Sequence, residues 1–247
     1  MCILMVIHRV LGDYPIIVAA NRDEYYDRPT QGPALLSSSP RTWGGRDERA
    51  GGTWMGVNEH GVVVGLTNRR LHAEQEADPE RRSRGMACLE ALQGRSAAEA
   101  VASLTTQPPQ RYNPFNLLAM DRSQLVWVAY DDEAVIRPLQ PGLHILANGN
   151  LNDFETTRLR RAHKLLQAAK PTSFPTLLPF LEQVCRDHEP GVQNRETICM
   201  HRDADNYGTV SSTVLALPAD SRQPVYRYAA GHPCQTSYAA VPSVEFI

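Results

Sequence analysis

The stretch CILMVIHRVLGDYPIIVAANRDE, residues 2–24, contains two short β-rich runs on either side of a turn. Gly12 and Asp13 are typical turn residues, so the stretch predicts an N-terminal antiparallel hairpin. Pairing across that turn is expected to bring Asn21 back beside Cys2. The segment NRDEYYDRPT, residues 21–30, then predicts a polar loop that follows the second strand directly.

Cys2 directly follows the initiator methionine, which is usually removed when the next residue is small. Removal would place the Cys2 thiol beside its own α-amine. A free cysteine titrates near pH ~8.5 and an α-amine near ~7.7–8.0, so the amine can act as a base for the thiol. The alternative is a small apolar residue that begins an edge strand, a role that cysteine fills well.

The composition restricts the class of protein. Hydrophobic residues make up 42% of the 247 residues, enough for a sizeable core, and the formal charge of −2 gives no electrostatic signature for nucleic acid. We expect no signal peptide and no membrane span, because no apolar run approaches the ~20 residues that a span requires. The five cysteines show no CxxC pair, which argues against a disulfide framework or zinc ribbon and predicts a reduced, cytoplasmic protein.

Strand-like and helix-like blocks alternate along the chain. Residues 80–105 and 153–188 predict two helical blocks, in which Ser96 and Asp153 are the expected N-caps. Strands are expected before, between and after these blocks, whereas residues 33–52 predict a loop rich in Gly, Ser, Pro and charge. Such blocks predict an α/β protein of the α+β type, organised as a layered sandwich in a single domain over residues 1–247. A parallel Rossmann sheet fits poorly, because hairpins dominate.

Charged side chains follow the second predicted strand. An asparagine or aspartate at Asn21 or Asp23 could hydrogen-bond the Cys2 amine, and an arginine such as Arg22 or Arg28 could lower the thiol pKa or bind a substrate carboxylate. The alternative is a solvated loop with ordinary surface ion pairs.

Asparagines end two later strands and are candidate donors to an oxyanion. Asn148 is the preferred donor, and Asn68 and Asn150 are the next candidates. The alternative for each is that the asparagine simply forms part of a turn. Thr209 and Ser211 either face the site or form the polar side of an alternating strand. Trp54 either walls a pocket or anchors a loop.

The segment from His201 to Asp205 alternates His, Asp and Asp, as metal ligands can. The spacing matches neither a calcium-binding EF-hand loop nor an HExxH zinc motif, so a surface turn is the favoured interpretation. We expect no metal and no cofactor.

Four blocks, MC at residues 1–2, VAANRDEYYDRPT, GGTWMGVNEHGVVVGLTN and YGTVSSTVLAL, together resemble the NRDE family, which includes transport-and-Golgi-organisation protein 2. They extend to about residue 217. The family is in turn similar to cysteine N-terminal nucleophile (Ntn) hydrolases, which implies a four-layer αββα sandwich of mainly antiparallel sheets. Those hydrolases carry an Arg-Asn-x-Asp stretch in the second strand. Here Asn21 and Asp23 match it, while Ala20 replaces the arginine and Arg22 or Arg28 would have to substitute.

The resemblance implies an amidohydrolase or acyltransferase acting on a small amide or thioester. Cys2 would be the nucleophile, Asn21 and Asp23 would orient the N-terminus, and Asn148 would stabilise the oxyanion. The expected substrate-binding residues are Arg22, Glu24, Arg28, Trp54, Asn68, Asn150, Thr209 and Ser211. The alternative is a non-catalytic haem or acyl-CoA/lipid binding and trafficking protein on the same scaffold. Both take a small-molecule partner, and only the first requires removal of Met1.

Overall fold

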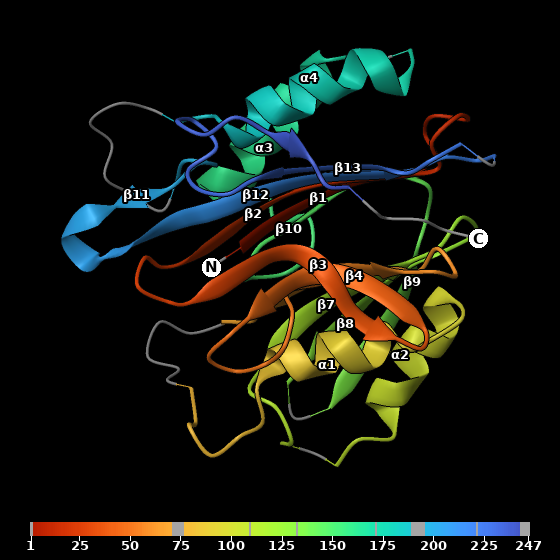
Figure 1. The fold of residues 1–247 in the computed structure, drawn as a ribbon, viewed down its shortest axis with the longest axis vertical. Coiled ribbons are helices and arrows are strands. Elements are labelled where there is room, and N and C mark those ends of the chain that lie inside the picture. Colours follow the sequence, from red (N-terminus) through yellow and green to blue (C-terminus); the bar gives the residue numbers. More distant parts are fainter. Residues whose placement is uncertain are drawn as a thin grey trace. The chain divides into compact units, whose positions relative to one another are not determined.

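The computed structural model describes residues 2–70, 77–108, 110–131, 133–170, 172–188, 196–220 and 222–242 (Figure 1). The chain divides into two compact units. Within the described residues, the first unit contains residues 2–27 and 142–242, and the second contains residues 28–141. The single domain expected from the sequence stays a prediction.

The first unit is built on a seven-stranded antiparallel sheet. Its two N-terminal strands form the predicted hairpin, and the second of them pairs with the longest strand of the unit. The β12–β13 pair then extends the sheet. In spatial order the strands are β10 (Gly142–Leu146), β1 (Cys2–His8), β2 (Ile16–Tyr25), β12 (Tyr207–Leu217), β13 (Val225–Ala229) and β14 (Ala239–Ala240), and β11 (His201–Arg202) also pairs with β12.

Two helices, α3 (Thr157–Ala168) and α4 (Phe174–Cys185), lie together against one face of this sheet (Figure 1). Ile3 and Met5 of β1 pack in one core cluster with Leu159 of α3 and Leu177 of α4. Because successive side chains of a strand point to opposite faces, Cys2 and its even-numbered neighbours on β1 lie on the face opposite the helices.

The second unit is also a seven-stranded antiparallel sheet, with strands that are neighbours in sequence and in space. They are β3 (Thr30–Ser38), β4 (Arg41–Asp47), β5 (Met55–Asn58), β6 (Val63–Asn68), β7 (Phe115–Met120), β8 (Leu125–Tyr130) and β9 (Ala134–Leu139). Helices α1 (Arg84–Ala91) and α2 (Ala97–Thr105) pack against it. The Ser96 cap is confirmed, since its side chain accepts a hydrogen bond from the Glu99 N–H.

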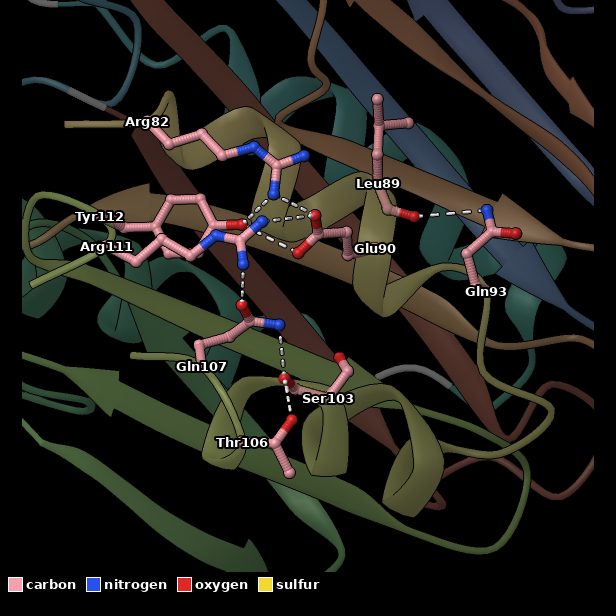
Figure 2. A network of polar contacts seen from close by, with 9 residues as sticks. All are labelled: Arg82, Leu89, Glu90, Gln93, Ser103, Thr106, Gln107, Arg111 and Tyr112. Carbon is pink, nitrogen blue, oxygen red and sulfur yellow. Dashed lines mark hydrogen bonds and ion pairs between the residues drawn. The ribbon is translucent and has the colours of Figure 1, made fainter. Parts of the chain in front are cut away.

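A polar network ties α1 and the end of α2 to the segment before β7 (Figure 2). Glu90 pairs with Arg82 and accepts a 2.8 Å hydrogen bond from the Tyr112 hydroxyl. Arg111 donates to Gln107, whose own amide donates to a backbone carbonyl of α2. Glu90 and Arg82 are about a third exposed, so the network lies at the surface of the second unit.

Three local expectations were wrong. The NRDE segment is part of β2 rather than a loop, because its pairing with β12 continues to Tyr25. Residues 33–52 are mostly strand, because β3 and β4 pair with each other despite two register shifts, and regular alternation is therefore absent from the sequence. The N-cap of α3 is Thr156 rather than Asp153, which instead accepts the Thr156 N–H in a turn.

The α+β class with two mainly antiparallel sheets and two helix pairs is confirmed. None of the helices in the described part of the chain combines the length and the hydrophobicity that a membrane span needs.

Candidate functional site

The strand register brings Cys2, Arg22 and Ser211 into one row across the first sheet. Cys2 pairs with Arg22, and Arg22 pairs with Ser211 at a bulge in β12. The expectation that Asn21 would lie beside Cys2 is wrong by one residue, because Asn21 pairs with Ile3. A slip of one residue moves a side chain to the other face of the sheet, so Arg22 takes the place expected for Asn21.

Asn148 and Tyr228 lie in line with the two ends of this row. Leu146 of β10 pairs with Leu4 of β1, and the same register continued by two residues on both segments would bring Asn148 beside Cys2. On the other side Tyr228 pairs with Thr213, two residues from Ser211. Arg22, Ser211 and Asn148 are all buried. The row therefore gathers a thiol, a guanidinium and hydroxyls on the face opposite α3 and α4, and the continued register would add the Asn148 amide at one end.

Burial is the main influence on the Cys2 thiol. It raises the pKa of Cys2 above its ordinary value, and the Asp23 carboxylate acts in the same direction. The positive charge of the chain's N-terminus opposes the rise most, followed by a hydrogen bond with the Asp23 backbone and the positive charge of Arg22. Burial also raises the pKa of Tyr228, while Ser211 and Arg22 act to lower it. With Met1 in place the thiol is therefore protonated at neutral pH and needs a base.

Asn21 lies on the opposite face of β2, where it holds the helical layer. Its amide nitrogen donates 2.9 Å hydrogen bonds to the carbonyls of Cys185, at the end of α4, and Ile198. Asn21 is buried, so these bonds join β2 to two segments that are far away in sequence. Asn21 therefore holds β2, the strand that carries Arg22, against these two segments.

Asp23 also faces the helical layer, in a buried ion pair with Arg158 of α3. The charged atoms are 2.6 Å apart, and the side chains are 0% and 3% exposed. Thr209 donates a 2.6 Å hydrogen bond to the other carboxylate oxygen of Asp23 and accepts the Met200 N–H at 2.8 Å. A buried charge remains stable when its partner and hydrogen bonds are in place, so this network fixes the backbone next to Cys2.

The other predicted site residues lie outside this row. Glu24 follows Arg22 on β2 and is half-buried, and Asn150 is exposed two residues beyond Asn148. The remaining three belong to the second unit. Arg28 forms a 2.7 Å ion pair with Asp47, Trp54 covers Gly45 so closely that a Cβ there would clash with its ring, and Asn68 ends β6 opposite Phe115. Their roles stay predictions.

Two residues of this arrangement were missed from the sequence. Tyr228 lies in the run VYRYA, whose alternation predicts a strand but not its neighbours. Arg158 is in a helix with several other arginines, and its burial among them leaves no signal in the sequence.

A family model described as "Transport and Golgi organisation 2" matches residues 1–226 of the chain. A "Transport and Golgi organization protein 2 homolog" from Bos taurus is 26% identical over 235 residues, which cover 84% of this chain and 83% of that protein. The likeness therefore includes both units and every candidate site residue through Ser211.

Two solved structures share the fold. A Caenorhabditis elegans N-acylethanolamine-hydrolyzing acid amidase ortholog aligns with a TM-score of 0.57 and 14% identity, covering 98% of this chain and 100% of that one. Penicillin V acylase from Agrobacterium tumefaciens aligns with a TM-score of 0.54 and 13% identity, covering 100% and 99%. The Ntn-hydrolase-like fold expected from the sequence is confirmed.

Proposed function

We propose that this chain, which belongs to the Transport and Golgi organisation 2 family, is an amidohydrolase or acyltransferase that uses Cys2 as an N-terminal nucleophile. Its substrate class is a small amide or thioester. The fold supports this proposal, since one of the two structures described above is named as an acid amidase ortholog and the other as an acylase. All five cysteines are free, which supports a reducing, cytoplasmic setting.

The observation that carries the proposal is the row formed by Asn148, Cys2 and Arg22. The pairing of Cys2 with Arg22 supports a guanidinium beside the thiol, and the β1–β10 register, continued by two residues, supports the Asn148 amide on its other side. An activated cysteine needs a base, a means to stabilise the thiolate and donors for the oxyanion. Removal of Met1 supplies the base, because the α-amine then belongs to Cys2 itself.

The reaction then runs in two halves. The α-amine takes the thiol proton, directly or through water, and the thiolate attacks the substrate carbonyl. The tetrahedral intermediate collapses and expels the amine or thiol leaving group, which takes the proton back from the α-ammonium. Water, deprotonated by the α-amine, attacks the resulting thioester and releases the acid with the free thiol. An acceptor amine in place of water gives acyl transfer.

The neighbouring side chains have separate roles in this proposal. Arg22 lowers the pKa of the thiol and binds an acidic group of the substrate. Asn148 donates to the developing oxyanion. Asp23 and Asn21 are positioning residues, because their bonds to Arg158, Cys185 and Ile198 hold β2 in register.

The test compares three proteins against a panel of small N-acyl amides and acyl thioesters. The chain with a free Cys2 amine is expected to hydrolyse at least one of them. Cys2→Ala should lower kcat/KM by about 10⁴-fold or more, as loss of a nucleophile does. An extra residue retained before Cys2 should abolish turnover with the fold intact, because the amine is then an amide.

Two results would overturn the proposal. Turnover that survives Cys2→Ala would exclude Cys2 as the nucleophile. Tight binding of an acyl thioester without turnover by the processed chain would favour the alternative, a binding and trafficking protein.

A further inference from the structure

A second group of reactive side chains lies in the first unit, away from the Cys2 row. Cys199, His201 and Cys234 each direct one ligand atom toward the others, and the three atoms all lie within 4.8 Å of one another. The His201 Nε2 atom is 3.2 Å from the Cys234 sulfur and 3.6 Å from the Cys199 sulfur. Cys199 is buried, and the other two are half-buried.

These three residues come from two segments that the sheet brings together. Cys199 lies just before β11 and His201 is its first residue. The pairing of β11 with β12 holds this segment in place. Cys234 follows β13 in a turn where the N–H groups of Gln235 and Thr236 both donate to the His232 carbonyl. Because β12 and β13 are paired, a separation of more than thirty residues in sequence closes to hydrogen-bond distance in space.

The backbone around Cys199 is held on both sides. The Cys199 N–H donates to the Asp187 carbonyl at 2.9 Å, and the Thr197 hydroxyl donates to the Cys199 carbonyl at the same distance. Met200 is bound through both its N–H and its carbonyl to Thr209, the residue that also binds Asp23. A ligand set on such a braced backbone is already close to the geometry it needs when the ion enters.

The distances match those of a tetrahedral metal site. Zinc–sulfur bonds of roughly 2.3 Å and zinc–nitrogen bonds of roughly 2.0–2.1 Å at tetrahedral angles place ligand atoms roughly 3.5 Å apart. The two sulfur–nitrogen distances, 3.2 and 3.6 Å, lie close to that value. Two thiolates would also cancel the charge of a divalent ion, which a partly buried site requires.

Two further imidazoles flank His201 and are candidates for a fourth ligand. The ring centroids of His232 and His188 lie 4.2 and 4.4 Å from that of His201. Each has a buried Nδ1 atom with no hydrogen-bond partner among the described residues. Buried polar atoms are normally satisfied, so a missing partner at both rings points to an unfilled ligand position.

We propose that Cys199, His201 and Cys234 bind a zinc ion, with His232 or His188 completing the tetrahedron. Thiolate and imidazole are the ligands that zinc prefers, whereas carboxylates suit harder ions. The ligand set differs from the His201, Asp203 and Asp205 alternation of the sequence. Asp203 is exposed and accepts the Tyr26 hydroxyl, and Asp205 pairs with Arg202.

The test is metal binding by the full chain, purified under reducing conditions and stripped with a chelator. One Co²⁺ per chain is expected to bind with a thiolate-to-cobalt charge-transfer band and intense visible bands. Zn²⁺ should displace it. Cys234→Ser and His201→Gln should each weaken Zn²⁺ binding by about 10–100-fold or more, at least the loss seen when an outer partner of a metal ligand is removed.

Matched controls come from the same residue types outside the cluster. Cys88→Ala and His60→Gln, both in the second unit, should leave Zn²⁺ affinity unchanged. Cys2→Ala should also bind Zn²⁺ normally, which separates this site from the proposed catalysis. His232→Gln and His188→Gln identify the fourth ligand, because only its loss changes the visible cobalt bands.

The proposal is overturned if no thiolate-to-cobalt band forms, or if Zn²⁺ affinity is the same in Cys234→Ser and His201→Gln as in the parent chain. A Cys199–Cys234 disulfide in the isolated protein, with no Zn²⁺ taken up after reduction, would also overturn it. Cys234 lies in a half-exposed turn, so its variant carries the test even if a change at buried Cys199 prevents folding.

Discussion

Asn21 in the first unit and Asn58 in the second perform a similar task. The Asn21 amide nitrogen binds the carbonyls of Cys185 and Ile198, and that of Asn58 binds the carbonyls of Leu92 and Gly94, so each reaches the C-terminal end of a helix. Both side chains are buried. In each unit, an interior asparagine therefore bonds the sheet to the C-terminal end of one helix.

The two asparagines differ in their oxygen atoms. The Asn58 oxygen accepts the N–H groups of His60 and Val62, both at 3.0 Å, so all of its polar atoms are used. The Asn21 oxygen has no hydrogen-bond partner among the described residues. Among the described residues, the buried side-chain polar atoms without a hydrogen-bond partner all lie in the first unit, and the Asn21 oxygen is one of them.

The ion pairs of the two units differ in burial. Asp23 and Arg158 are almost fully buried, whereas Glu90 and Arg82 are about a third exposed. Exposed ion pairs contribute little to stability, but the loss of one partner from a buried pair leaves an uncompensated charge.

The largest effect is expected from Asp23→Ala. It leaves Arg158 charged and buried, so the free energy of unfolding should fall by about 3–5 kcal/mol. Urea unfolding of the full chain measures this. Replacing both residues, as Asp23→Leu with Arg158→Met, should recover part of the loss. A double variant that is no more stable than Asp23→Ala would mean that the charge is not what destabilises it.

A smaller effect is expected at the two asparagines. Asn58→Ala breaks four hydrogen bonds and should cost about 3 kcal/mol, while Asn21→Ala breaks two and should cost about 2 kcal/mol. Urea unfolding of the two variants in parallel gives the ranking. If Asn21→Ala lowered the free energy of unfolding more than Asn58→Ala, the Asn21 oxygen would have to form a further hydrogen bond in the folded protein.

A pH-dependent effect is expected at Asp121 of the second unit. Burial acts to raise the pKa of Asp121, but hydrogen bonds from Ser123, Ala97 and Gln124 outweigh it, and the net pKa lies below the ordinary 3.8. A lowered pKa in the folded state stabilises the protein above the ordinary value, and this contribution disappears as pH falls through the folded pKa. Asp121→Asn should cost about 1 kcal/mol at neutral pH.

The difference in free energy of unfolding between Asp121→Asn and the parent chain should begin to narrow as pH falls below the ordinary pKa of 3.8, because Asp121 in the unfolded chain is then protonated. Urea unfolding from pH 7 down to pH 3 measures the difference. A gap that stays constant over this range would contradict the assignment.

The smallest effect is expected from Glu90→Gln. Its partner Arg82 is about a third exposed to solvent and also donates a hydrogen bond to the Tyr112 hydroxyl. The free energy of unfolding should therefore change by about 1 kcal/mol or less. A loss comparable to that of Asp23→Ala would remove the contrast between the two networks.

The sequence was informative where a local rule decides the structure. The Ser96 cap and the hairpin around Gly12 are local features, and the structure has both. The register was missed by one residue because the hairpin closes through a wider loop, in which the Arg9 N–H donates to the Pro15 carbonyl, and the turn residues Gly12 and Asp13 do not fix the length of that loop. That slip decided whether Asn21 or Arg22 lies beside Cys2.

Longer-range placements could not be read from the chain. The burial of Arg158 depends on a strand more than a hundred residues away, and Cys199 meets Cys234 only because β12 pairs with β13. Charged residues within a strand, as at Arg22 and Asp23, look like a loop until their partners in α3 and β12 are known. The candidate site residues were therefore predicted from motifs, whereas their neighbours required the fold.

The most direct test of the central claim is the intact mass of the chain purified from its native host, before and after treatment with iodoacetamide. We predict loss of Met1 and preferential alkylation that disappears in Cys2→Ala, since an adjacent free amine activates the thiol. Retention of Met1, or labelling that is unchanged in Cys2→Ala, would contradict the account of Cys2 as an N-terminal nucleophile.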